Sequence, residues 1–159
     1  MAIDPREFRN TLGCFATGVT VITTTDANGK PVGLTANSFT SVSLDPPMVL
    51  FCLDRKVASF EAFNQGGGFA VNILTEEQKE ISNRFATSGD DKWEGVSFDT
   101  WDGASPIIPN SLANMECRVS EIFEGGDHII ILGKVTKIAS GEATPLLYWR
   151  GQYATIDSQ

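Results

Sequence analysis

Short β-forming runs separated by glycine- and proline-containing turns fill most of the sequence, and this spacing limits the folds open to the chain. The run VTVITTT at 19–25 precedes DANGK at 26–30, whose Asn-Gly pair is a strong hairpin signal. A second strand is expected to begin near Pro31. Regular strand–helix–strand alternation is missing, which argues against a doubly wound parallel sheet.

Further strands are expected along the rest of the chain. The apolar run 48–53 is expected to be a central strand buried on both faces. The other expected strands are 69–74, 96–101, 113–119, 128–139 and the aromatic ending LLYWRGQYATI. Alternation in 113–119 places Asn114 and Glu116 opposite the apolar side chains, as in a half-buried strand. Seven or eight antiparallel strands with two or three helices favour a mainly β fold, a closed or nearly closed barrel without exposed edges.

Three helices are predicted between the strands. Asp4 and Pro5 begin the first, which is expected to pack its apolar stripe (Phe8, Leu12, Phe15) on a sheet and to end near Gly18. The second spans 54–64. Thr75 and Gln78 form a capping box for the third, which continues to about Ala86 with Ile81 and Phe85 facing inward.

Composition is that of one globular domain over residues 1–159, with 42% hydrophobic and 20% charged residues. No apolar run approaches the roughly 20 residues of a membrane span, and the start MAIDPREF does not resemble a signal peptide. The net charge of -8 argues against nucleic acid. Three widely spaced cysteines suit a reduced, cytoplasmic protein, and a structural zinc site is not expected.

Common catalytic motifs are absent or fail. Gly13 and Gly18 have the spacing of a phosphate-binding loop, but Val19 and Thr20 stand where Lys and Ser/Thr belong. The glycines at 66–68 precede a strand rather than a helix, and no GxSxG occurs. His128 is the single histidine, and by itself it is weak evidence of a catalytic role. With one histidine and no nearby Cys or His ligands, a metal centre is not expected.

The stretch GLTANSFTSVSLDPP at 33–47 is unusually rich in hydrogen-bonding groups. It carries six such side chains between positions 35 and 43, namely Thr35, Asn37, Ser38, Thr40, Ser41 and Ser43. Small side chains let a ligand approach the backbone, and Pro46 and Pro47 end the run. Composition alone favours an ordinary polar edge strand.

Four separated motifs resemble the short-chain flavin reductases, the reductase components of two-component flavin monooxygenases. They are TANSFTSVSLDPP followed by MVLFCL, SNRFA at 82–86, GDH at 126–128 and LLYWRGQY near the end. The resemblance covers nearly the whole chain, from FRNTLGCFATGVTVITT onward. It implies an FMN-binding antiparallel split β-barrel and a homodimer.

The resemblance also implies roles for particular residues. Thr35, Ala36, Asn37 and Ser38 are expected to line the flavin ring and ribityl chain, with further contacts from Ser41, Cys52 and Phe85. Lys56, Ser59 and Arg84 are the candidates for binding phosphate. His128 is expected to lie where nicotinamide docks, with Tyr153 a second candidate on that side.

The implied function is NAD(P)H:flavin oxidoreductase activity, with hydride passing from nicotinamide to FMN or FAD and reduced flavin diffusing to a monooxygenase. The sequence does not decide between FMN and FAD, and NADH is the default over NADPH. Three alternatives remain. They are a flavoprotein that holds FMN tightly, a flavin- or haem-binding barrel without NADH turnover, and a carrier of apolar ligands, for which the polar stretch is a poor lining.

Overall fold

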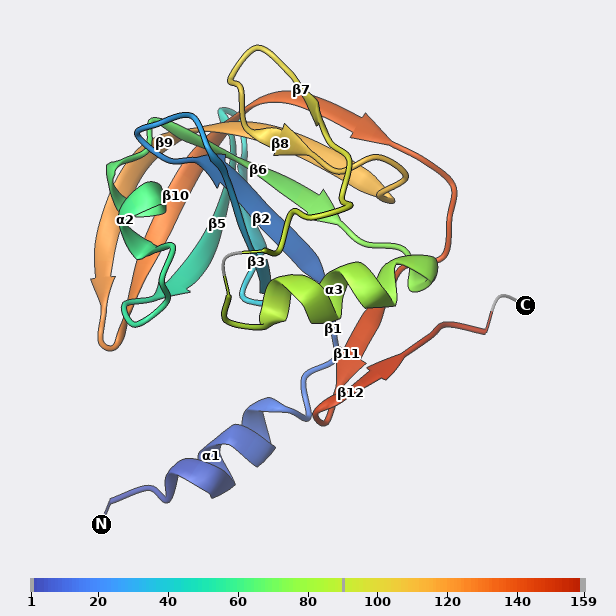
Figure 1. Ribbon diagram of the computed structural model, residues 1–159. Helices are drawn as coiled ribbons and strands as arrows, with labels where there is room; N and C mark the ends of the chain where they lie inside the picture. Colours follow the sequence, from blue (N-terminus) through green and yellow to red (C-terminus); the bar gives the residue numbers. More distant parts are fainter. Residues whose placement is uncertain (1, 90, 158–159) are drawn as a thin grey trace.

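The computed structural model describes residues 2–89 and 91–157 and is built on one curled, seven-stranded antiparallel sheet (Figure 1). Its strands run in the order β3 (Pro31–Ala36), β2 (Thr20–Thr25), β6 (Gly68–Ile73), β9 (Ala113–Gly125), β10 (His128–Ser140), β5 (Pro47–Asp54) and β4 (Thr40–Leu44). A small sheet contains β1 (Thr17–Gly18), β11 (Leu147–Trp149) and β12 (Gln152–Ala154), and β7 (Asp99–Thr100) pairs with β8 (Pro106–Ile107). The helices are α1 (Pro5–Leu12), α2 (Phe60–Gln65), the 3-10 turn η1 (Glu76–Gln78) and α3 (Lys79–Ala86).

The two edge strands of the main sheet are neighbours in the sequence. β3 ends at Ala36 and β4 begins at Thr40, so only residues 37–39 connect the two edges. A connection of this length spans at most about 14 Å. The sheet must therefore curl until its edges approach each other, although within the described residues β3 and β4 do not pair. The predicted antiparallel, mainly β split-barrel architecture is confirmed.

Most core side chains lie inside this curled sheet. The first cluster contains Ile22, Ala36, Val49, Phe51, Leu53, Phe63, Phe69, Val71, Cys117, Ile129 and Ile131. Phe51 packs edge-to-face with Phe63 and with Phe69. Its ring centroid lies 5.7 Å from that of Phe63 and 5.0 Å from that of Phe69. A second cluster, beneath α3, contains Val19, Val21, Leu74, Phe85, Ile108 and Leu146.

A buried amide network attaches the segment around β8 to the outer face of the sheet. Asn72 donates to Val21 O (3.0 Å), and its Oδ1 accepts from Ile108 N–H and from Asn114 Nδ2, both at 2.8 Å. Asn114 and Glu116 are consequently buried, whereas the alternation of β9 predicted a solvated face for them. That prediction was wrong because the segment around β8 covers this half of the sheet.

Two strand predictions need correction. β5 is not buried on both faces, since Val49, Phe51 and Leu53 are buried while Leu50 and Cys52 are partly exposed. It also lies beside the edge strand β4 rather than at the sheet centre. The expected strand at 96–101 is reduced to β7.

The first two helices are shorter than predicted. α1 ends at Leu12, contributes no buried residue and extends away from the main sheet, contrary to the expectation that it packs on a sheet (Figure 1). α2 begins only at Phe60, since residues 55–59 form turns in which Lys56 N–H donates to Asp54 Oδ1 at 2.8 Å. None of the helices within 2–89 and 91–157 is long and apolar enough to cross a membrane.

The predicted hairpin turns and the cap of the third helix are confirmed. The turn at 26–30 joins β2 to β3, and Gly126 adopts φ +77° in the turn between β9 and β10. Gln78 Oε1 accepts the N–H of Thr75 at 3.1 Å, as the capping box predicts. α3 then runs to Ala86, with Phe85 buried.

Gly133 should be intolerant of substitution. A Cβ at this position would lie 2.4 Å from Phe69 Cζ, and the Phe69 ring is itself held against Phe51. We expect Gly133→Ala to lower the free energy of unfolding by about 1–3 kcal/mol in urea denaturation. Gly18→Ala is the control, since no atom lies within 4 Å of its Cβ position. Equal stability of Gly133→Ala and the unsubstituted protein would contradict this packing.

Candidate functional site

Ser38 lies in the gap between the two sheet edges and is bonded to β5. Its hydroxyl donates to Cys52 O and accepts from Cys52 N–H, both at 3.0 Å. Thr40 pairs with Leu50 in the β4–β5 ladder, so Ser38, two residues before β4 begins, stands opposite Cys52 in the same register. The Ser38 side chain thus replaces the backbone partner that a longer β4 would supply. The backbone N–H and C=O of Cys52 are both hydrogen-bonded to it.

Cys52 is fixed by this arrangement. Burial raises the pKa of its thiol, which favours the neutral form. The thiol is therefore not an activated nucleophile. On its other side, β5 pairs Cys52 with Ile130 and Asp54 with His128.

Thr35 and Ala36 end the opposite edge strand, β3. The Thr35 hydroxyl donates to Ser82 O at 2.6 Å, and Ala36 is buried with its carbonyl accepting from the Thr20 hydroxyl at 2.7 Å. The Thr35 hydroxyl is therefore directed onto α3 in this structure. Both residues belong to an edge that is unpaired within the described part of the chain, where backbone N–H and C=O groups are available to a ligand.

Asn37 is exposed and lies with Ser38 in a groove of about 960 Å³. The opposite wall comes from α1 and the residues after it, including Arg9 and Phe15, and from the turn after β11, including Arg150. Two cationic side chains thus line this groove beside the polar stretch. Ser41 lies further along β4, exposed and paired with Val49.

His128 and Lys56 come together at the end of β5. His128 Nδ1 is 2.7 Å from Asp127 Oδ1, and Asp127 O accepts from Arg55 N–H at 3.1 Å. The hydrogen bond from His128, with the positive charges of His128 and Lys56, lowers the pKa of the Asp127 carboxyl. Ser59 is the partly exposed N-cap residue of α2 and makes no capping bond with its hydroxyl.

The remaining predicted residues lie on or against α3. Arg84 is exposed and donates to Glu94 O, and within the described residues no hydrogen bond or ion pair joins it to Lys56 or Ser59. Phe85 is 1% exposed and packs edge-on to Trp93, so its ring supports β3 from within the core rather than presenting a surface to a ligand. Tyr153 Oη is hydrogen-bonded to two α3 side chains, those of Ser82 and Asn83.

Sequence reasoning missed the groove wall and the roles of Asp127 and Ser82. Asp127 and Ser82 stand inside the quoted motifs GDH and SNRFA, so the signal was present. The groove wall carries no comparable signal, because it depends on how α1 and β11 pack.

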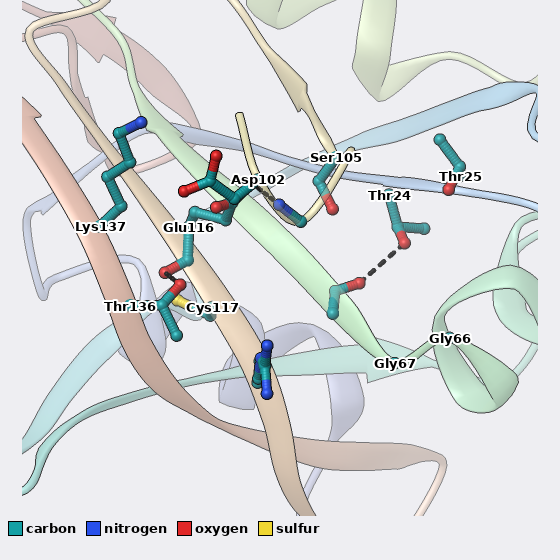
Figure 2. A pocket seen from close by; sticks show the side chains of 13 residues that line it. Thr24, Thr25, Gly66, Gly67, Asp102, Ser105, Glu116, Cys117, Thr136 and Lys137 are labelled. Atoms are coloured by element: carbon teal, nitrogen blue, oxygen red, sulfur yellow. Dashed lines mark hydrogen bonds between the residues drawn. The ribbon is translucent and has the colours of Figure 1, made fainter. Parts of the chain in front are cut away.

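A second cavity, of about 550 Å³, lies elsewhere on the sheet and is lined by none of the predicted site residues (Figure 2). Glu116, Thr136 and Lys137 come from β9 and β10, and Asp102 and Ser105 from the segment that covers them. Gly103 N–H donates to the buried Glu116 carboxylate at 2.8 Å. Burial and the Glu116 charge raise the pKa of Cys117 to about 12, so its thiol is inert.

The chain matches the family model "Flavin reductase like domain" over residues 12–157. It is 43% identical over 160 residues to the reductase subunit HsaB of a flavin-dependent monooxygenase from Mycobacterium tuberculosis, covering 99% of this chain and 85% of that protein. It is 47% identical over 152 residues to a "Probable flavin reductase" from Rhizobium meliloti, covering 96% of this chain but only 49% of that protein. The chain thus spans about half the length of the Rhizobium relative.

Solved structures agree with these sequence matches. Flavin reductase PheA2 superposes with a TM-score of 0.89 at 41% identity, covering 98% of this chain and 100% of that one. The NADH:FAD oxidoreductase SgcE6 of Streptomyces globisporus was solved with NAD and FAD fragments. It superposes with a TM-score of 0.91 at 33% identity, covering 99% of this chain and 97% of that one. Fold and site together define an antiparallel split-barrel protein with an open polar edge. The chain belongs to the flavin reductase-like domain family.

Proposed function

We propose that this protein is an NAD(P)H:flavin oxidoreductase that supplies reduced flavin to a separate flavin-dependent monooxygenase. The observation that carries the proposal is the open edge of β3 at residues 35–36, from which the chain leads to Ser38 on Cys52 of β5. Cys52 lies two residues from Asp54, the β5 residue that pairs with His128. Relatives named as monooxygenase reductase subunits support the partner, and the Agrobacterium fabrum relative named "FMN reductase (NADH) SmoA" supports NADH as the donor.

The residues present fit a flavin. A flavin ring carries both donors and acceptors on one edge, and an unpaired strand edge offers N–H and C=O groups in alternation. Asn37, with an exposed carboxamide, and the backbone at Thr35, Ala36 and Cys52 would hold the ring and ribityl chain, with Ser41 further along β4. Lys56, Ser59 and Arg84 would hold phosphate. The bound flavin supplies the hydride-accepting chemistry.

His128 would orient the nicotinamide. With the Asp127 carboxylate against Nδ1, that nitrogen carries a proton and the ring orientation is fixed. Nε2 is then the atom that can hydrogen-bond a substrate or hold a proton. Hydride transfer needs no strong acid or base from the protein, so the role of His128 is positioning and proton exchange at Nε2.

NADH oxidation by the purified protein tests the proposal. We expect the NADH absorbance to decay only when FMN or FAD is added, and the rate of decay to saturate with flavin. Comparing the FMN and FAD saturation curves shows which flavin is preferred. The same assay with NADPH shows which nicotinamide donor is preferred. Activity without added flavin would indicate a protein that holds FMN tightly. Flavin binding without NADH oxidation would leave a binding protein and remove the proposed function.

Substitutions of His128 and Asn37 should affect different quantities, the use of NADH and the affinity for flavin. His128→Ala should lower kcat/KM for NADH by about tenfold or more while leaving flavin affinity within about twofold, because the residue lies on the nicotinamide side. Asn37→Ala should raise the flavin Kd several-fold through the loss of about one hydrogen bond. Steady-state kinetics and flavin-fluorescence titration measure the two quantities. Equal losses of both in His128→Ala would refute its assignment to nicotinamide.

We also propose that the protein is a homodimer and works in the cytoplasm. Phe8, Leu12 and Phe15 form an apolar stripe on and after α1 and are 53%, 57% and 79% exposed. Contiguous apolar surface of this kind commonly marks a protein interface. The cysteines Cys14, Cys52 and Cys117 are all free, which suits a reducing compartment.

Substitution in this stripe should dissociate the dimer. In sedimentation velocity, Phe8→Glu/Leu12→Glu should sediment as a monomer at a concentration where the unsubstituted protein is a dimer, since burying two carboxylates in an apolar interface is unfavourable. Arg6→Glu, on the opposite side of α1, is the control and should remain dimeric. A monomeric unsubstituted protein, or a dimeric double variant, would contradict the proposal.

A further inference from the structure

Three hydroxyl-bearing residues connect the C-terminal hairpin to the candidate flavin edge. Tyr153 on β12 is hydrogen-bonded to Ser82 on α3, with 2.7 Å between Tyr153 Oη and Ser82 Oγ. Ser82 O in turn accepts from the Thr35 hydroxyl on β3 at 2.6 Å. We refer to Tyr153, Ser82 and Thr35 as the hydroxyl relay.

The direction of each bond in the relay follows from donor counts. Tyr153 Oη has one hydrogen, which it donates to Asn83 Oδ1 at 2.9 Å. The bond with Ser82 must then run from Ser82 Oγ–H to Tyr153 Oη. Ser82 is fully buried, and within the described residues its hydroxyl makes no other hydrogen bond. Tyr153 is therefore the acceptor that satisfies a buried donor on α3.

The hairpin that carries Tyr153 is itself anchored. β11 pairs with β1 and β12, and Arg150 N–H, in the turn between β11 and β12, donates to Gly13 O at 2.9 Å. The Lys79 ammonium lies over the Tyr153 ring, 5.4 Å from its centroid, and the Tyr148 ring packs edge-on. The ring position thus does not depend on the hydroxyl, and a phenylalanine would retain these contacts.

We propose that Tyr153 is a positioning residue for flavin binding, acting through Ser82 on Thr35 rather than by contact with nicotinamide. This inference rests on the proposed function. The Tyr153 hydroxyl fixes Ser82, and the Ser82 carbonyl holds Thr35 so that the unpaired edge of β3 keeps one conformation. Without the hydroxyl, Ser82 Oγ–H becomes a buried donor with no partner, and α3 must shift or admit water to satisfy it. A less ordered edge then binds flavin more weakly.

The test measures flavin Kd by fluorescence titration and thermal stability by circular dichroism on the full chain. We expect Tyr153→Phe to raise the Kd for the preferred flavin about tenfold and to leave kcat at saturating flavin within about twofold. Thr35→Val should also raise the Kd. Because both act through one relay, Tyr153→Phe/Thr35→Val should raise it no more than the larger single effect, rather than by their product.

Thr24→Val is the matched control. It removes another buried threonine hydroxyl that donates to a carbonyl, Gly68 O at 2.8 Å, near the other end of the β2–β3 pair. It should lower thermal stability without changing the Kd. If Tyr153→Phe fails to fold, Ser82→Ala/Tyr153→Phe removes the unpaired donor as well and should fold. Its Kd should still be raised, because the bond that fixes Ser82 to Tyr153 is lost.

The outcomes separate this inference from the function it rests on. An unsubstituted protein that binds neither FMN nor FAD overturns the proposed function. An unsubstituted protein that binds flavin, with an unchanged Kd in Tyr153→Phe, overturns the relay alone. The relay is also overturned if Thr24→Val raises the Kd as much as Tyr153→Phe, or if the Tyr153 and Thr35 effects multiply. A loss of kcat for NADH without a change in flavin Kd would return Tyr153 to the nicotinamide side.

Discussion

The pair of hydrogen bonds between the Ser38 hydroxyl and the backbone of Cys52 is what the candidate site depends on. A curled sheet can close by pairing its edges or can leave them apart, and unpaired edges invite association with other chains. Ser38 satisfies the edge of β5 with a side chain, so β4 need not extend to Cys52. The gap between the edges remains, and the connection 37–39 that crosses it carries Asn37 into the groove.

The two sides of the gap are supported differently. On the β5 side, the ladder with β10 fixes Cys52 and the corner that holds His128, and the Ser38 hydroxyl bonds to the other edge of Cys52. On the β3 side, only one neighbouring strand, β2, supplies a backbone ladder. Further support comes through side chains, since Thr35 bonds to α3 and Gly33 packs against the Phe85 ring, where a Cβ would lie 2.9 Å from Cε1. Backbone ladders are cooperative, whereas side-chain contacts can be lost one at a time. The β3 edge is therefore the side on which single substitutions should affect ligand binding most.

Local sequence signals predicted the parts of the fold that local interactions determine. The Asn-Gly hairpin, the turn at Gly126 and the Thr75–Gln78 cap each involve residues within a few positions of one another. The stretch 33–47 reads as one polar run, yet it forms two strands at opposite edges of the sheet, because its partners β2 and β5 are set by long-range pairing. The burial of Asn114 depends on Asn72, 42 positions away, and α1 lies free of the sheet despite its apolar stripe. For the candidate site, the motifs supplied the candidate residues, while only the structure shows that Ser38, Thr35 and Tyr153 use their hydroxyls within the protein.

Charge bears on how such a site would release its ligand. The chain carries a net charge of -8, which disfavours anions at long range, and its 12 Lys and Arg residues include the phosphate candidates Lys56 and Arg84. These two cations are not joined to acidic side chains by ion pairs within the described part of the chain. A phosphate group would meet separate, exposed cations rather than a prearranged cluster, and exposed charge pairs contribute little in water. If these cations hold the flavin phosphate, as we propose, we expect moderate, reversible binding, as for a flavin that is a substrate rather than a permanent group.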